Sequence, residues 1–387
     1  MLTDRLTALR GQAREWGADF RTVALELDRD PDRVMDFLDL PGVRCMSTLG
    51  IPPEFGASPL TVGRHTFAEV TALERVIVLE GLARGDVGMT LAAPGPSMSG
   101  VLLEQLGDQG QRELFYRRLL EAPTWTCFAL TEPDRGSDAG ALATALREEG
   151  GRRMLSGAKR YVGNAVRAQY ATVFARTRPG PLGVTAVLVD TGAAGYSAEP
   201  LDTLGLRGAQ LGAITLDRVV VEPDRVLGRH LSPTRRGIWA CLQVFNQLRP
   251  GVAALALGIA ESAHEYLSEH RESDRGADRE RIEVLGWKID ATRDLVYRAA
   301  AAVDATGDGH LASAAKARAC ALAEEVTLTA CELLGPAARL THPLLDKLVR
   351  DARGVEFMEG TRNIQYLNLF QGLLAGRVGA RAQARLR

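Results

Sequence analysis

Cysteine and excess charge of either sign are scarce in this chain, and each absence argues against a class of protein. The cysteines among the 387 residues are widely scattered, form no C-x-x-C pair, and are Cys45, Cys127, Cys241, Cys320 and Cys331. They are interpreted as reduced core residues of a cytoplasmic protein, and no metal site is expected. Lys and Arg (47) nearly cancel Asp and Glu (48), so no global field draws the molecule to nucleic acid or to an anionic membrane.

Long uncharged runs are also absent. No such run reaches the length of a membrane span, and the amino-terminal segment MLTDRLTALRGQAREW carries charges throughout without the apolar stretch of a signal peptide. We therefore expect a cytoplasmic protein with neither membrane nor nucleic acid as a partner. What the chain does have is 46% hydrophobic residues, enough to fill a sizeable core, over a length that predicts two or three structural units.

The spacing of apolar residues changes twice along the chain. Over residues 1–122 they recur every three or four positions, which predicts a helical domain with a loop at IPPEFGA. Over 123–232 the pattern shortens to strand-like runs separated by turn residues, which predicts a β domain. Over 233–387 the helical period returns in Ala-rich stretches that suggest an antiparallel bundle, ending in a basic tail without an apolar stripe. The fold class is α+β.

One acid near the end of the chain raises a question. In VEFMEGTRNIQ, residues 355–365, Glu359 follows apolar Phe357 and Met358 and precedes Gly360 and Thr361. A Gly costs about 1 kcal/mol within a helix, so the Gly-Thr step interrupts good helix formers. The segment is consistent with a helix boundary carrying a solvated Glu, and equally with a partly buried base where a ligand approaches the backbone.

Four segments together resemble a known family. CFALTEPDRGSDAGAL (127–142) looks like the flavin-binding signature of the acyl-CoA dehydrogenases, roughly TEPGAGSD. Residues 155–176 are similar to that family's second flavin strand, 204–228 to the segment closing its β domain, and 348–365 to its final active-site stretch. The four lie in the family's order and span essentially the whole chain. The resemblance implies an acyl-CoA dehydrogenase-like fold: a helical N-terminal domain, a β-barrel-like middle domain and a C-terminal four-helix bundle.

The same resemblance implies the chemistry. Members of the family use FAD to desaturate an acyl thioester: a base takes the α proton while the β hydrogen leaves as hydride to flavin N5. A carboxylate in a dry slot is a stronger base than in water, and Glu359 has that place. Some branches carry the base on an earlier helix, at the position that is Leu248 here, and Leu cannot take a proton.

Further site residues follow from the match. The resemblance places the flavin against Phe128, Leu130, Thr131, Gly136, Ser137, Tyr161, Gly163, Thr361 and Asn363, and the thioester against Ser137, Arg249 and Gly360. For Arg249 a cation at the core edge, satisfied by a helix end, is the alternative. For the TEP-x-x-GSD run the alternative is an ordinary β turn, because Pro, Asp, Gly and Ser all favour turns.

The chain departs from the family in several places. Gly163 stands where a Thr usually offers its hydroxyl near flavin N5, and a Gly is also seen there in an oxidase-like branch. Arg271 lacks the usual Phe-Gly after it, and Glu332 replaces a Gln that cradles the cofactor's adenine end across a subunit interface. Ala57 replaces a loop Gly. The electron acceptor, an electron-transfer flavoprotein or O2, and the assembly, homodimer or homotetramer, therefore stay open.

The substrate is the least determined feature. The thioester is carried by CoA or by an acyl carrier protein, since both present the same phosphopantetheine arm. Met89, Leu91 and Met98, together with residues near Val244 and Phe245, are candidates for the acyl cavity, with plain core packing as the alternative. Two other classes remain: a helical-bundle protein with relic motifs, and a non-enzymatic flavoprotein that binds nucleic acid through Arg377, Arg381, Arg385 and Arg387.

Overall fold

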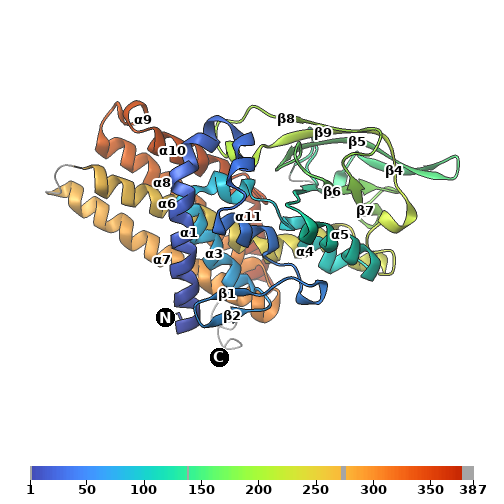
Figure 1. Ribbon diagram of the computed structural model, residues 1–387, viewed down its shortest axis with the longest axis horizontal. Helices are drawn as coiled ribbons and strands as arrows, with labels where there is room; N and C mark the ends of the chain where they lie inside the picture. Colours follow the sequence, from blue (N-terminus) through green and yellow to red (C-terminus); the bar gives the residue numbers. More distant parts are fainter. Residues whose placement is uncertain (1, 137–138, 272–275, 377–387) are drawn as a thin grey trace.

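The computed structural model describes residues 2–136, 139–271 and 276–376. Helices gather on one side of the molecule and the main sheet on the other (Figure 1). The first part of the chain is mainly helical, with a short hairpin of two strands, and its elements are α1 (Asp4–Arg29), α2 (Pro41–Thr48), β1 (Leu60–Val62), β2 (His65–Phe67), α3 (Ala72–Ala92), α4 (Ser97–Leu106) and α5 (Gln109–Glu121).

Side-chain caps explain where these helices begin. The Thr71 hydroxyl accepts the Glu74 backbone N–H while the Glu74 carboxylate accepts that of Thr71, a reciprocal pair that satisfies donors no helical carbonyl can reach. Asp108 and Gln111 repeat the arrangement at the start of α5. The expected loop IPPEFGA contains a single 3₁₀ turn at Pro53–Phe55.

The middle of the chain forms one mixed sheet. Its strands in the described part of the chain are β3 (Thr126–Ala129), β4 (Ala145–Glu149), β5 (Arg152–Val162), β6 (Tyr170–Arg176), β7 (Val184–Asp190), β8 (Tyr196–Pro200) and β9 (Gly212–Val220). The order is β3-β6-β4-β5-β9-β8, with β7 paired to β6. β3 runs parallel to β6 and pairs Phe128 with Thr172, so the two strands end at the same edge. β4 and β8 show no clear strand pattern in the sequence, because their charged and exposed residues obscure the alternation of apolar and polar positions.

The last part of the chain is again helical. Its elements are α6 (Ile238–His270), α7 (Ala277–Thr306), α8 (His310–Leu334), α9 (Ala338–Thr341), α10 (Pro343–Val355) and α11 (Arg362–Leu374). α6, α7 and α8 pack against one another in the bundle. The α+β class with helical, β and helical parts is thereby confirmed, while the domain boundaries at 122 and 232 stay predictions.

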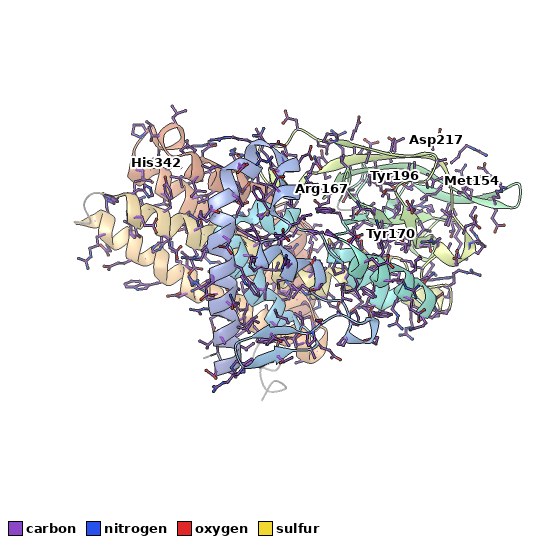
Figure 2. The ribbon with its side chains drawn as sticks, viewed as in Figure 1. Met154, Arg167, Tyr170, Tyr196, Asp217 and His342 are labelled. Atoms are coloured by element: carbon purple, nitrogen blue, oxygen red, sulfur yellow. The ribbon has the colours of Figure 1, made fainter. Side chains whose placement is uncertain are left out.

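Three apolar clusters hold the parts together. One joins α3 to α6, α7, α8 and α10, a second joins α1 and α3 to the sheet, and a third joins the sheet to α4, α5 and the start of α6. Arg167 lies where helices and sheet meet (Figure 2), and its guanidinium donates to the Pro31 carbonyl and to the Gln210 side chain. No helix in the described ranges is long and apolar enough to cross a membrane.

The three apolar clusters separate the residues expected to line the acyl cavity, Met89, Leu91 and Met98. Met89 is fully buried in the second cluster, Leu91 packs against the first, and Met98 packs against the third. The three residues therefore pack in different apolar clusters. Core packing, the alternative reading, is confirmed for Met89, and only Met98 shares a cluster with Val244 and Phe245.

Candidate active site

Glu359 lies on the turn that joins α10 to α11. Its φ is 51°, a left-handed conformation that is uncommon for a residue with a side chain, and Gly360 follows with φ 96°. A Cβ on Gly360 would also lie 3.1 Å from Ile364. The turn thus requires glycine at 360, directly after Glu359.

The carboxyl group of Glu359 is set inside the molecule. The residue as a whole is half-buried, but its Oε2 atom is buried and has no hydrogen-bond partner among the described residues. Burial raises the pKa of Glu359 to about 7, and the charges of Arg249 and Lys316 partly oppose that rise. The group is therefore not a solvated acid at a helix boundary, and it can accept a proton near neutral pH.

Arg249 lies on α6, and its charge acts on the Glu359 carboxyl group. It is 3% exposed, and its Nη1 donates to Asn246 Oδ1 and Ser313 Oγ, both at 3.3 Å. Its Nε has no partner within the described chain. Burial lowers the pKa of Arg249, and Glu359 opposes that change, so the two groups share one electrostatic environment. The alternative of an arginine satisfied by a helix end does not describe these contacts.

An apolar cluster connects Arg249 with the sheet. The Phe128 ring at the end of β3 lies 6.1 Å from the Phe245 ring, and the Arg249 guanidinium carbon lies 5.9 Å from the Phe245 ring centre. Met98 and Leu248 pack against the same cluster. Contacts therefore connect the Arg249 side of the bundle with the edge where β3 ends, through apolar side chains of the kind that suit an aliphatic chain.

Several polar atoms of the predicted flavin-binding segments have no hydrogen-bond partner in the described part of the chain. Neither the Thr131 nor the Thr361 hydroxyl makes a hydrogen bond to any described residue, although Thr361 occupies the N-cap position of α11. Asn164 donates to the Leu91 carbonyl, and its own Oδ1 is buried without a partner. Tyr161 is 59% exposed in a left-handed conformation. An aromatic face and several unused polar atoms fit the isoalloxazine that the sequence implied.

A buried ion pair, between Lys159 and Glu132, holds the segment of the first flavin signature (127–142) in place. Lys159 Nζ lies 2.9 Å from Glu132 Oε1 and donates to the Leu130 carbonyl, while Glu132 accepts the backbone N–H groups of Ala143 and Thr144. These bonds pin the residues just after Leu130 to the start of β4. The Glu of the TEP run is therefore structural, and it orients its neighbour Thr131.

The remaining predicted residues are less enclosed. Gly136 and Asn363 are exposed, and nothing lies within 4 Å of a Cβ built on Gly136. Ser137 lies outside the described residues, as does the arginine-rich tail. Gly163 has ordinary space around it, since the nearest atom to an added Cβ is on Leu211 at 3.9 Å.

Sequence reasoning missed two residues that hold the Glu359 turn. Lys316 donates to the carbonyls of Glu356 and Gly360, and Gln365 donates to those of Glu359 and Gly360. The Ala-rich run ASAAKARACALA contains two basic residues, and the signal for Lys316 was its position, which the helical period assigns to the buried face.

Arginines also gather at a hollow near the first signature. A cavity of about 450 Å³ is lined by apolar residues from 141 to 145, by Pro179, and by the arginines Arg135, Arg147, Arg176 and Arg178. The Arg176 guanidinium donates to the Gly140 carbonyl, whereas the guanidinium groups of the other three make no hydrogen bond or ion pair to a described residue. Because Glu132 pins residues 143 and 144, this hollow lies beside the segment that carries Thr131.

The altered bundle residues are paired within the chain. Glu332 receives both Nη atoms of Arg281, at 3.1 and 2.8 Å, and Arg271 Nη2 lies 2.5 Å from Asp278. The Arg281 partner offsets the charge of Glu332, and it lowers the pKa of that carboxyl. The negative charge that Glu332 brings to this position is therefore paired within the chain.

Comparison with known proteins gives a consistent result. Two family profiles match, "Acyl-CoA dehydrogenase, middle domain" over residues 127–219 and "Acyl-CoA dehydrogenase, C-terminal domain" over 235–374. A 3-(aryl)acrylate reductase of Clostridium sporogenes is 28% identical over 96% of this chain and 99% of its own. The butyryl-CoA dehydrogenase structure from Megasphaera elsdenii has a TM-score of 0.82 at 26% identity and covers 97% of this chain and 99% of its own. That of the prolyl acyl carrier protein oxidase AnaB has a TM-score of 0.81 at 21% identity, with 96% and 100% covered.

Proposed function

Because the chain belongs to the acyl-CoA dehydrogenase family, we propose that it catalyses FAD-dependent α,β-dehydrogenation of an acyl thioester with Glu359 as the base. The observation that carries this proposal is the Glu359 carboxyl group, whose Oε2 is buried and unpartnered and whose pKa is raised to about 7. A base with a pKa near the working pH combines a useful ionised fraction with proton affinity.

In this proposal, different residues of the chain take the proton, contact the acyl group and hold the cofactor. Glu359 takes the α proton at its unpartnered oxygen, and the charge of Arg249 favours the ionised form of that carboxylate. The apolar side chains around Phe128, Phe245 and Leu248 contact the acyl group and exclude water from it. FAD, when bound, supplies the acceptor for the hydrogen that leaves the β carbon as hydride. Thr131, Tyr161 and Thr361 hold it through the open hydroxyls and the exposed ring.

A visible spectrum and a thioester titration test the proposal. We expect the purified protein, as isolated or after reconstitution with FAD, to be yellow and to bleach under anaerobic conditions when an acyl thioester is added. A protein that cannot take up FAD would identify a relic bundle. A yellow protein that no CoA-bound or carrier-bound thioester bleaches would support a non-enzymatic flavoprotein of the same fold.

The arginine hollow receives the phosphate-bearing end of the thioester carrier. Its open guanidinium groups suit phosphate, and it lies beside the segment that carries Thr131. Phosphate is common to CoA and to the arm of an acyl carrier protein, so the proposal includes both carriers. The AnaB likeness shows the fold alone.

Charge removal in the hollow is expected to raise KM. Arg147 and Arg178 are exposed and unpaired, so their replacement by Ala should not disturb folding. Since a hydrogen bond to a charged group contributes about 1.5–3 kcal/mol, we expect KM for the preferred carrier to rise roughly tenfold or more per arginine. Steady-state kinetics of the same acyl group on CoA, on a carrier protein and on pantetheine measure this.

The three substrates separate the carriers. An increase confined to the CoA thioester identifies a nucleotide carrier, and one confined to the carrier protein identifies a protein carrier; KM for the pantetheine thioester should not change in either case. Arg117→Ala, an exposed arginine on α5, is the matched control. Unchanged KM for both carriers would show that the hollow does not take the phosphate.

Reoxidation depends on Gly163. A dehydrogenase that passes electrons to an electron-transfer flavoprotein is our first reading, and an enzyme reoxidised by O2 is the second. Gly163 has room for a side chain, so Gly163→Thr restores the family's hydroxyl without a clash. If the missing hydroxyl admits O2, the natural protein reoxidises in air with peroxide release, and Gly163→Thr slows that step while reduction stays similar.

Stopped-flow reoxidation of both forms decides between the two acceptors. A natural protein that reoxidises slowly, and no faster than Gly163→Thr, would leave the dehydrogenase reading. Gly163→Ala is the matched control, because it fills space without adding a hydroxyl.

We also expect a cytoplasmic homo-oligomer. α11 exposes a group of large apolar side chains, Tyr366, Leu367, Phe370, Leu373 and Leu374, and Trp287 and Leu328 are exposed on α7 and α8. Exposed apolar side chains in such number favour contact with a second copy of the chain, as a homodimer or homotetramer. Light scattering of the purified protein measures the assembly.

A further inference from the structure

The lysine that contacts the Glu359 turn has no ion-pair partner in the described part of the chain. Lys316 is fully buried in α8, and among the described residues its Nζ donates to main-chain carbonyls alone, those of Glu356 at 2.7 Å and Gly360 at 2.6 Å. By contrast, the buried Lys159 and Lys347 each lie against a carboxylate. A buried ammonium without an ion-pair partner is costly, so a lysine serving only to fill the core is a poor explanation.

The two bonds of Lys316 span the turn. They reach the carbonyl of Glu356, where α10 ends, and that of Gly360, immediately after Glu359. Gln365 closes the other side by donating to the Glu359 and Gly360 carbonyls. Because Glu359 and Gly360 both have positive φ, this backbone is held by its surroundings rather than by local preference.

The charge of Lys316 acts on the same carboxyl group. Burial lowers the pKa of Lys316, with Cys320, Glu356 and Glu359 opposing that change. The charge of Lys316 in turn counters the rise in the pKa of Glu359. The described titratable or charged groups around Glu359 are Arg249 and Cys241 on α6, Lys316 and Cys320 on α8, and Glu356 and Arg362 at the ends of the turn.

We propose that Lys316 is a positioning residue for Glu359: its ammonium group closes the turn that presents the carboxylate, and its charge favours the ionised form of that carboxylate. This inference rests on the proposed function, in which Glu359 is the base. Lys316 itself touches neither substrate nor cofactor in this proposal. Its two contributions, a hydrogen-bonded turn and a positive charge, are separable by substitution.

The pH profile of anaerobic flavin reduction provides the test. In the natural protein the rate should rise with pH through a midpoint near 7, because Glu359 must be ionised to accept a proton. Lys316→Met removes the cation but keeps the chain length, so the midpoint should move up by about one unit or more, and the rate at neutral pH should fall roughly tenfold. Lys316→Arg keeps the charge and should keep the midpoint.

Two further variants separate geometry from charge. Lys316→Gln retains a donor for the carbonyls but not the charge, so it should share the upward shift and carries the test if Lys316→Met does not fold. Cys320→Ala changes a neutral neighbour, one turn along α8, that contacts the Val355 carbonyl, and it should leave the midpoint unchanged. A merely structural lysine would lower the rate or the unfolding temperature in Lys316→Met and Lys316→Gln without moving the midpoint, and that result would overturn the proposal.

A second readout does not depend on turnover. The side-chain carboxyl of Glu359, observed by ¹³C NMR in the purified full-length protein and assigned by its loss in Glu359→Gln, should titrate at higher pH in Lys316→Met than in the natural protein. If Glu359→Gln leaves the kinetic midpoint in place, the proposed base is wrong. If Glu359→Gln abolishes that midpoint but Lys316→Met moves neither the kinetic nor the NMR midpoint, only the role of Lys316 is wrong.

Discussion

Replacement of Glu359 by Gln is expected to separate cofactor binding from chemistry. Gln keeps the shape and most of the hydrogen-bonding capacity of Glu, but it cannot accept the α proton. Flavin should remain bound while its reduction by an acyl thioester slows by roughly 10²–10⁴-fold, the usual effect of losing a general base. The residual rate should also lose its dependence on pH near 7, because that dependence belongs to the Glu359 carboxyl.

Single-turnover stopped flow measures both the amplitude and the rate of this reduction. Glu261→Gln is a matched control: it makes the same chemical change to a mostly buried acid on α6 that pairs with Arg14 and Arg293. It should cost some stability and leave reduction unchanged. Reduction of Glu359→Gln at the natural rate would show that another group takes the proton.

The second large effect concerns the contact between α1 and α3. A Cβ at Gly17 would lie 2.1 Å from the Gly81 carbonyl oxygen, and one at Gly85 would lie 1.8 Å from the Gly17 oxygen. Neither neighbour is a flexible side chain, so relief requires the helices to separate. We expect Gly17→Ala to destabilise the protein by about 3 kcal/mol or more, at the upper end of the range for overpacked cores.

Gly11 lies on the same helix and provides the control. Nothing lies within 4 Å of an added Cβ there, so Gly11→Ala should stabilise α1 by up to about 1 kcal/mol, because Ala has the better helix propensity. Thermal unfolding measured on both variants should therefore shift in opposite directions. Equal shifts would contradict the close approach of the two helices.

The same glycines show where prediction from sequence succeeds and where it stops. The three- and four-residue spacing of apolar positions predicts α1 and α3 as helices; α1 buries one face, whereas α3 is buried on almost every side. Gly11 and Gly17 nevertheless look alike in sequence, six positions apart on one helix. Only the position of the partner helix distinguishes a glycine that can be replaced from one that cannot.

The residues of the candidate site also divide into those that a local motif identifies and those that only the fold brings together. The resemblance singled out Glu359, Arg249 and Thr131 because their motifs are local and recognisable. Lys316 and the hollow lined by Arg147 and Arg178 had no such motif, since each depends on segments that meet only after folding. The apolar candidates were separated for that reason too, with Met89 in one cluster and Met98 in another.

The sequence by itself determined the α+β class, the order of helical and β parts, the family and the acid that serves as the proposed base. Periodicity and short motifs are properties of residues that are close in the sequence, so they can be recognised without knowledge of the fold. Only the tertiary structure decided the state of that acid. Burial of the Glu359 carboxyl, opposed by Arg249 and Lys316 from two other helices, raises its pKa to about 7, because desolvation and charge depend on distance in space rather than along the chain.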